Sequence, residues 1–168
     1  MYNKFKWGNV KDAKYLDPQS SDDISIFNNV FNTTISGLIK EGKIADAKKV
    51  VNRYFEVMPD RFYGMRSMMG TYFLAENLYT LGDTQRANSL MQKSADYIQK
   101  ELTYLADVSK SKNRFVGGQN VQLGLQFLNQ MVKTATEHKQ TKLAQQLSQQ
   151  FQGLEARFSI YFSQQPQE

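Results

Sequence analysis

The sequence predicts an all-α protein made of three antiparallel helical hairpins that stack on one another. Apolar residues recur every three or four positions through most of the 168 residues, which is the period of one helix face. Only 3 prolines and 10 glycines interrupt the chain, which argues against a loop-rich or all-β protein. Two segments repeat each other 40 residues apart: Gly42-Lys-Ile-Ala-Asp-Ala47 and Gly82-Asp-Thr-Gln-Arg-Ala87. A repeat of about this length is typical of stacked helical hairpins.

The first hairpin is predicted over about residues 22–59. Ser20 and Asp23 have the spacing of a capping box, so the first helix is expected to begin there. Gly42 is expected to end that helix, because glycine adopts the left-handed conformation of a helix C-terminus. Pro59, which cannot continue a helix, is expected to end the second helix. One face of the first helix carries Ile24, Phe27, Phe31, Ile35 and Leu38.

The second hairpin is predicted over about residues 63–106, and the third over about 119–163 with its turn at 137–140. Residues 107–119 contain Ser, Lys, Asn and Gly and are expected to be a connector. The first helix of the second hairpin carries two apolar stripes, which indicates contacts on two sides. One stripe is Met65, Met68, Tyr72, Ala75 and Tyr79, and the other is Thr71, Leu74, Leu78 and Leu81.

The two ends of the chain differ from the predicted single domain, 21–163. Residues 1–20 form an arm in which Phe5, Trp7 and Tyr15 are interspersed with lysines. The aromatic side chains need cover, so the arm is expected to pack on the body. Trp7 is expected to be a buried anchor, with ligand stacking as the alternative. Residues 164–168 are polar and are expected to be a frayed tail.

Composition excludes several kinds of site. The chain has no cysteine, which excludes disulfides, zinc–thiolate sites and thiol nucleophiles. Its one histidine, His138, cannot by itself build a catalytic triad or a two-histidine metal site. The net charge of +5 is spread along the chain, and Lys110, Lys112 and Arg114 come nearest to the clustered stripe that nucleic-acid binding needs. We expect no catalytic residues, cofactor, metal or nucleic-acid partner, and no stretch approaches the ~20 apolar residues of a membrane span.

Leu81-Gly82-Asp83 followed by Ala87 resembles the tetratricopeptide repeat, and Ala75 lies where that repeat has a small residue. In the first copy, Ala47 and Pro59 lie where the repeat has its alanine and its terminal proline. The resemblance implies a right-handed superhelix, and because the third hairpin departs from the repeat, the stack is expected to cap there. The departures are Ile35 at the small position of the first copy, the missing proline of the second, and His138 for glycine and Leu143 for alanine in the third.

A second resemblance covers essentially the whole chain. Lys4-Phe-Lys-Trp-Gly-Asn9, then Tyr15-Leu-Asp17, then the Gly42 hairpin ending in Met58-Pro59 resemble the C-terminal region of a family of multi-pass membrane proteins from Gram-negative bacteria of the Bacteroidetes type. The family has no assigned function, and its membrane part is similar to protein O-mannosyltransferases. The resemblance implies a soluble appendage of an inner-membrane glycosyltransferase-like protein, on the periplasmic side. A free-standing chain would be cytoplasmic. The family's presumed catalytic carboxylates lie in the membrane part, and none maps onto this chain.

Stacked hairpins would leave a concave face lined by the first helix of each hairpin. In the repeat register this face presents Asn29, Asn32, Ser36, Tyr72, Glu76 and Tyr79. Polar and tyrosine side chains suit contact with a peptide or a glycan; the alternative is that Tyr72 and Tyr79 are edge residues of the core. We predict a non-catalytic interaction or scaffolding domain that binds a protein or peptide segment, such as the membrane part of its own parent chain. The alternative is a purely structural domain that forms a homodimer, most readily through its last helix.

Overall fold

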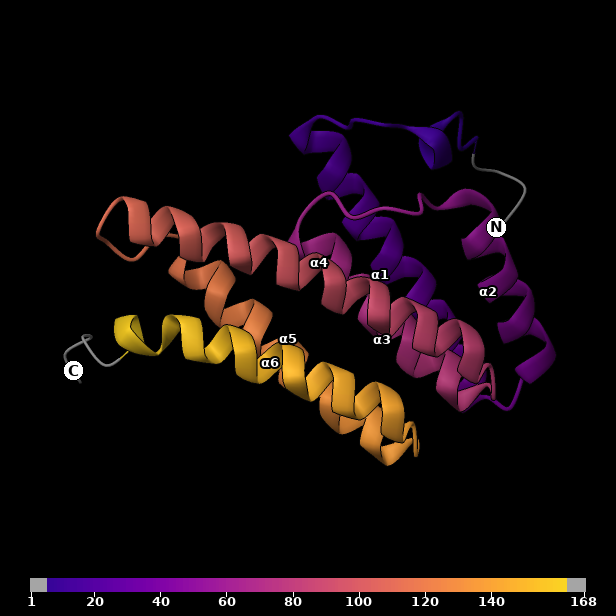
Figure 1. Cartoon of the computed structure of the whole chain (residues 1–168). Helices are drawn as coiled ribbons and strands as arrows, with labels where there is room; N and C mark the ends of the chain where they lie inside the picture. Colours follow the sequence, from indigo (N-terminus) through magenta and orange to yellow (C-terminus); the bar gives the residue numbers. More distant parts are fainter. Residues whose placement is uncertain (1–5, 163–168) are drawn as a thin grey trace. The chain divides into compact units, whose positions relative to one another are not determined.

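The computed structural model describes residues 6–162, and every regular element in that range is a helix (Figure 1). One 3₁₀ helix, η1 (Val10–Asp12), precedes six α-helices, and no strand occurs between residues 6 and 162. The predicted all-α class is therefore confirmed. Lys4 and Phe5 of the expected arm, and the expected tail at 164–168, lie outside the described residues.

Packing divides the chain into two compact units, Met1–Ala87 and Asn88–Glu168. The first unit contains η1, α1 (Pro18–Lys40), α2 (Ile44–Val57) and α3 (Met65–Thr80). The helix α4 (Thr84–Ser111) begins in the first unit and continues through the second. The second unit also contains α5 (Gly118–Glu137) and α6 (Thr141–Phe162).

The start of α1 corrects the predicted capping box. The N-cap is Asp17, whose Oδ1 accepts from the backbone N–H of Ser20 at 3.1 Å and whose Oδ2 accepts from the Ser20 hydroxyl at 2.7 Å. Pro18 occupies the first position of the helix, where a missing N–H costs nothing. The start predicted at Ser20 and Asp23 is therefore wrong, because a better cap with a favourable proline lies just before it.

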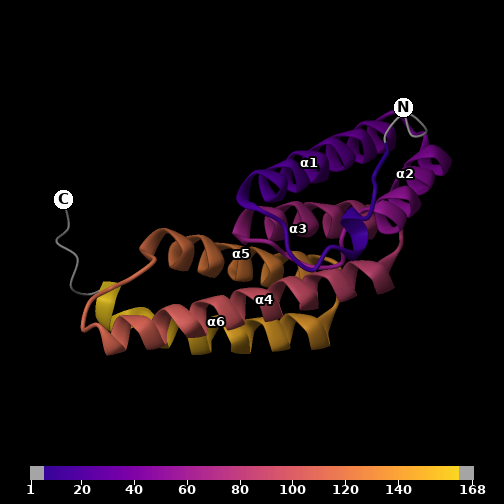
Figure 2. The ribbon, with the colours of Figure 1, turned by 90° about the horizontal axis from the view of Figure 1, so that it is seen from above.

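In the first unit, α1 packs on both α2 and α3 (Figure 2). Its core face buries Ile24, Phe31 and Ile35, whose spacing places them on one side of the helix. The ring of Tyr54 in α2 meets Phe31 edge-on, with centroids 5.3 Å apart. α2 ends at Val57 because the residue before Pro59 is extended, as proline requires of its predecessor.

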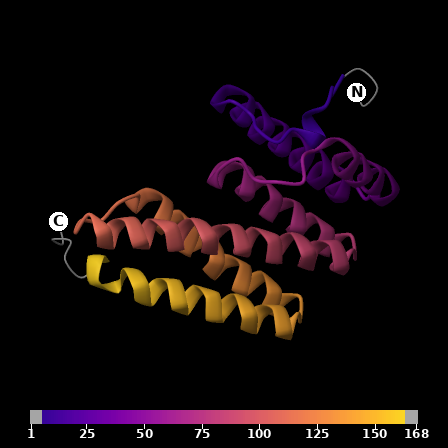
Figure 3. The ribbon, with the colours of Figure 1, turned by 45° about the horizontal axis from the view of Figure 1, so that its top comes forward.

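In the second unit, α5 and α6 pack on each other and run in opposite directions (Figure 3). α4 extends to Ser111, so the connector predicted at 107–119 is too long. The reason lies in the buried Ser109, whose hydroxyl accepts from the backbone N–H of Val116 at 3.0 Å and draws the short loop back to the helix. The side chains buried by α5 and α6 include Leu125, Leu128, Leu147, Leu154 and Phe158.

Three helix-to-helix turns share one backbone conformation. Each ends its helix with a residue of positive φ, and the next residue donates its N–H to the carbonyl five positions back, as in a Schellman motif. The positive-φ residues are Gly42 (72°), Gly82 (79°) and Lys139 (58°), and the bonds are Lys43 to Leu38 at 2.9 Å, Asp83 to Leu78 at 2.8 Å and Gln140 to Ala135 at 2.8 Å.

The third turn corrects the sequence alignment by one residue. Lys139, and not His138, has the left-handed conformation that corresponds to the two glycines. Ala144, and not Leu143, then follows five residues later, and its N–H donates to the carbonyl of Gln140 at 2.9 Å. The alignment failed because a lysine in this conformation gives no sequence signal, whereas glycine does.

Candidate functional site

The six residues predicted to line a concave face are not equally accessible. Asn32, Tyr72 and Tyr79 are buried, with exposed fractions of 8%, 2% and 7%. Ser36 and Glu76 are half-buried, and Asn29 is exposed. All six residues lie on α1 and α3 of the first unit. Burial removes three of them from direct contact with a partner, and the other three remain candidates.

A row of buried asparagines joins α1 to α3 beneath these residues. Asn28 Nδ2 donates to the carbonyl of Ser67 at 3.3 Å, and Asn32 Nδ2 donates to the carbonyl of Gly70 at 2.7 Å. Asn28 Oδ1 also accepts from the Tyr54 hydroxyl of α2 at 2.9 Å. Buried amides need such partners, so the row allows one alignment of α1 along α3.

The row ends at the surface, where Asn77 links the two helices. Its Nδ2 donates to Asn32 Oδ1 at 3.4 Å, and its Oδ1 accepts from the Ser36 hydroxyl at 2.9 Å. Ser36 and Asn77 are both half-buried. Two predicted residues, Asn32 and Ser36, are thus brought together by a third residue that the sequence patterns did not single out.

Phe73 is a candidate binding residue that the sequence patterns missed. It belongs to neither apolar stripe of α3, and it is 43% exposed. Glu76 and Asn77 follow at three and four positions along the helix, so they share its side of α3. The sequence signal that could have identified it is an aromatic residue that lies outside both apolar stripes of its helix. We call the following set the α1/α3 face: Asn29, Thr33, Ser36, Phe73, Glu76 and Asn77.

The charge of the α1/α3 face comes from Glu76. Its carboxylate accepts a hydrogen bond from the hydroxyl of Tyr72, one helical turn earlier. The hydroxyl of the buried Tyr79 adds no charge at neutral pH, because burial raises its pKa to about 12. The face therefore presents one acidic side chain among neutral polar groups and one exposed aromatic ring.

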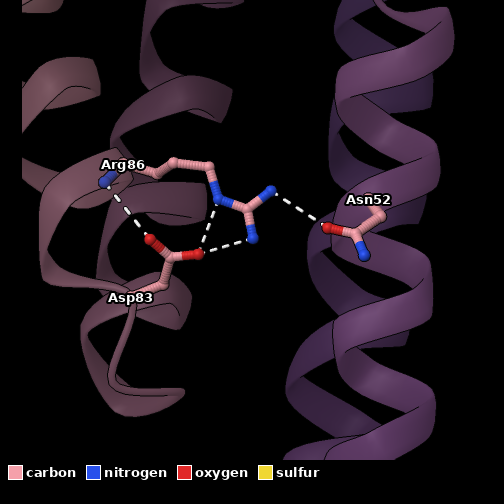
Figure 4. A network of polar contacts seen from close by, with 3 residues as sticks. All are labelled: Asn52, Asp83 and Arg86. Atoms are coloured by element: carbon pink, nitrogen blue, oxygen red, sulfur yellow. Dashed lines mark hydrogen bonds and ion pairs between the residues drawn. The ribbon is translucent and has the colours of Figure 1, made fainter.

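A polar cluster fixes the turn before α4 to α2 (Figure 4). The Arg86 guanidinium bonds to Asp83 Oδ2 through Nε at 2.6 Å and to Asn52 Oδ1 through Nη1 at 3.0 Å. It also lies over the ring of Phe55, 4.9 Å from the centroid. The hydrogen bond from Arg86 lowers the pKa of the Asp83 carboxyl. These contacts are all made within the first unit, so the cluster is a structural clamp.

A cavity of about 310 Å³ lies between the N-terminal arm and the first turns of α1. Trp7 and Phe27 both line this cavity, and their rings meet edge-on with centroids 5.0 Å apart. Trp7 is thus the half-buried anchor of the arm and also a wall of the cavity. The lining is apolar at Trp7, Val10, Ala13, Leu16, Ile24 and Phe27, and polar at Lys6, Asn9, Ser20 and Asp23.

Three hydrogen bonds to or from the arm hold it on the rest of the first unit. Lys11 Nζ donates to the carbonyl of Phe55 at 2.9 Å. The carbonyls of Ala13 and Lys14 accept from the hydroxyl of Tyr63 at 2.7 Å and from Arg61 at 2.8 Å, respectively. Because the arm is tied by its backbone as well as by its rings, the outer wall of the cavity is preformed.

Residues 6–162 contain neither a metal-binding cluster nor a membrane-spanning helix. No group of three or more His, Asp or Glu side chains in this range could hold a metal ion. None of the helices in the same range is both long enough and apolar enough to span a bilayer.

No protein-family model matches this chain, and neither does any curated protein or solved structure. The two resemblances drawn from the sequence therefore stay predictions. Two features of this chain could bind a partner or a ligand, namely the α1/α3 face and the cavity under the arm.

Proposed function

We propose that this chain is a non-catalytic helical-repeat domain that binds an extended protein segment on the α1/α3 face. The observation that carries the proposal is Phe73, an aromatic ring 43% exposed beside Glu76 and Asn77. Aromatic residues are enriched where protein surfaces bind one another, and polar groups form the rim of such contacts. Phe73 would be the apolar anchor of the contact.

The repeat architecture is supported by the turns and by the packing of α1. The three turns inside the predicted hairpins share one cap conformation, which the end of α4 at Asn113 also has. α1 packs on α3, which is the contact that the first helices of consecutive stacked hairpins would make. We propose a right-handed, tetratricopeptide-like stack on this basis.

The chemistry of the α1/α3 face indicates the kind of segment. Phe73 would pack against an apolar side chain, and Glu76 would pair with a basic one. Asn29 and Thr33 are exposed on α1 and offer donors and acceptors to an extended backbone. An apolar residue close to a lysine or arginine is therefore the expected signature of the ligand.

We also propose that the domain is the periplasmic appendage of a membrane glycosyltransferase-like protein, and that the bound segment belongs to the membrane part of the same parent. The support for this assignment is the sequence resemblance that begins at the aromatic arm and continues through the Gly42 hairpin. An appendage of this kind would act by positioning a segment, with the chemistry left to the membrane part.

Selection from a displayed library of random peptides tests the binding function. The wild-type chain should enrich peptides with an apolar residue beside a basic one. Phe73→Ala should lose most of this binding, and Glu76→Lys should lose the preference for a basic residue. Tyr104→Ala removes an aromatic ring that is 64% exposed on α4, and Glu155→Lys reverses an exposed charge on α6; both are matched controls and should bind as wild type. Equal enrichment by Phe73→Ala and wild type would contradict the proposal.

A structural, dimer-forming domain is the second candidate, and Ile160 favours it. Ile160 lies near the end of α6 and is 64% exposed. Light scattering of the full chain decides between the candidates. A dimer at low micromolar concentration that Ile160→Lys converts to monomer would support the second candidate, and a monomer at all concentrations would exclude it.

A further inference from the structure

The cavity between the arm and α1 has a composition that the α1/α3 face does not share. It combines two aromatic rings with one ammonium group and one carboxylate, on Trp7, Phe27, Lys6 and Asp23. We propose that it binds a small zwitterion with an apolar body, namely an α-amino acid with an apolar side chain. The proposal is independent of the proposed function, because the two sites share no residue.

The volume and the apolar lining set the size of the ligand body. The cavity of about 310 Å³ is about twice the volume of an engineered apolar cavity that holds benzene. Small-molecule sites are mostly apolar with a few polar groups that orient the ligand. Trp7 and Phe27 would contact the apolar side chain of the ligand. Asn9 and Ser20 add a neutral amide and a hydroxyl to the lining.

The charges of the lining set the chemistry of the ligand head. Lys6 and Asp23 line the same cavity, and neither makes a hydrogen bond or an ion pair with any residue in the range 6–162. A ligand with one charge would satisfy only one of them. An α-amino acid carries a carboxylate for Lys6 and an ammonium group for Asp23, both attached to its α-carbon. Each pair should contribute up to about fivefold in affinity, as expected for charges that stay partly solvated.

The arm prepares the cavity before a ligand arrives. Its backbone carbonyls at Ala13 and Lys14 are held by Tyr63 and Arg61, at 2.7 and 2.8 Å. A wall that is already in place loses little conformational freedom on binding, which favours affinity. Trp7 is the only tryptophan of the chain, so its fluorescence reports this cavity alone.

Titration of the full chain with four probes that share a phenylethyl skeleton tests the proposal. The probes are L-phenylalanine, phenethylamine, 3-phenylpropionate and the uncharged N-acetyl-phenylalanine amide. Binding is followed by Trp7 fluorescence and confirmed by calorimetry, which does not depend on the tryptophan. L-phenylalanine should bind most tightly, each singly charged probe about fivefold more weakly, and the uncharged probe most weakly.

Two variants assign the charges. Lys6→Met should weaken L-phenylalanine and 3-phenylpropionate but leave phenethylamine unchanged. Asp23→Asn should weaken L-phenylalanine and phenethylamine but leave 3-phenylpropionate unchanged. Lys14→Met and Asp22→Asn are matched controls, because both side chains are exposed, lie close along the chain and do not line the cavity. Far-UV circular dichroism checks that each variant is folded.

Three outcomes would overturn the proposal. The first is that no probe saturates the Trp7 signal at millimolar concentration. The second is that the uncharged probe binds as tightly as L-phenylalanine, which would show a merely apolar cavity. The third is that the control variants weaken binding as much as Lys6→Met and Asp23→Asn, which would show a general effect of surface charge.

Discussion

The contact of α1 with α3 and the contact of α5 with α6 are built from different chemistry. Across the first, the amides of Asn28 and Asn32 bond to backbone carbonyls of α3. Within the second, the buried residues are mainly aliphatic and aromatic, with Leu128, Leu147 and Phe158 fully buried. One contact is fixed by directional bonds, and the other by the burial of apolar surface.

This difference separates the strength of a helix contact from its register. A buried hydrogen bond contributes a modest net free energy, but an amide left without a partner costs about 1–3 kcal/mol. A slip of α1 along α3 would therefore be penalised at each asparagine. Leucine side chains lose less on a small shift, because the hydrophobic effect is not directional. We infer that the alignment of α1 along α3 is specified more sharply than the alignment of α5 along α6.

Phe158→Ala should destabilise the protein more than the other substitutions at these two contacts. Phe158 is fully buried in the second unit, and the centroid of its ring lies 6.0 Å from the ring centroid of Phe115. Loss of the ring removes buried apolar surface and leaves a cavity, so the free energy of unfolding should fall by about 3–5 kcal/mol. Urea denaturation followed by circular dichroism measures this change. Phe151→Ala, at a half-buried position of the same helix, should cost clearly less; equal losses would show that apolar burial does not dominate α6.

Gly70→Ala tests the close approach of the polar contact. A Cβ at Gly70 would lie 2.6 Å from Cβ of Asn28, so α1 and α3 must move apart and weaken the asparagine bonds. We expect the free energy of unfolding to fall by about 1–3 kcal/mol, as it does at other overpacked sites. Denaturation followed by Trp7 fluorescence reports this loss, because the only tryptophan lies in the first unit.

Gly37→Ala is the matched control on α1. A Cβ there would meet nothing within 4 Å, so the substitution should raise stability by up to about 1 kcal/mol through helix propensity. If both alanine variants gain stability, the helices are not held as closely as the asparagine row requires, and the contrast between the two contacts fails.

Alkaline pH should destabilise the polar contact through Tyr54. Burial raises the pKa of Tyr54 to about 12, from an ordinary value of about 10. A raised pKa means that the fold prefers the protonated hydroxyl, so its stabilisation is complete below pH 10. It should be lost as the pH rises from 10 to 12, by about 1.4 kcal/mol per pH unit.

Tyr54→Phe separates this titration from the hydrogen bond to Asn28. The variant should be less stable than wild type at neutral pH, because Asn28 Oδ1 loses its donor. Its stability should depend less on pH between 10 and 12. Tyr15→Phe, at a position that is 79% exposed, should leave the pH dependence as in wild type. An unchanged alkaline slope in Tyr54→Phe would contradict the role of Tyr54.

The helices could be predicted from the sequence because their signals are local. Apolar periodicity, Gly42, Gly82 and Pro59 marked elements that the structure contains. The start of α1 was placed too late because two possible N-caps, Asp17 and Ser20, lie three residues apart. The third turn was misaligned because Lys139 adopts the left-handed conformation that glycine adopts in the other two turns. For the candidate site, the sequence left open whether Tyr72 and Tyr79 line the concave face or belong to the edge of the core, and both are buried.

Burial depends on contacts far apart in the sequence, which periodicity does not encode. The asparagine row illustrates this, since Asn28 and Asn32 become structural only when α3 supplies its carbonyls. Phe73 was overlooked for the converse reason, because it is an apolar residue that the fold leaves outside the core. The cavity under the arm needs residues from both the arm and α1, and no local pattern connects them.

The smallest effect is expected at the turns, where a charged side chain in the first unit corresponds to a neutral one in the second. Asp83 bonds to the backbone N–H of Arg86 and to its guanidinium, whereas Gln140 at the equivalent turn bonds to the amide of Asn88 at 2.9 Å. Asp83→Ala removes both the cap and the ion pair and should cost about 1 kcal/mol. Asp83→Asn keeps a capping side chain and should cost less at neutral pH.

Acid pH distinguishes the charge of Asp83 from its capping role. Because its pKa is lowered in the fold, its ionised form stabilises the protein above its ordinary pKa, and this stabilisation is lost as the pH falls below that value. Asp83→Asn should therefore reduce the acid sensitivity of the first unit, measured by Trp7 fluorescence during denaturation. Gln140→Ala should leave the acid sensitivity unchanged, because glutamine does not titrate. If Asp83→Asn is as acid-sensitive as wild type, the ion pair of Asp83 with Arg86 does not contribute to the stability of the first unit. The asparagine row would then be the polar contact that stabilises this unit.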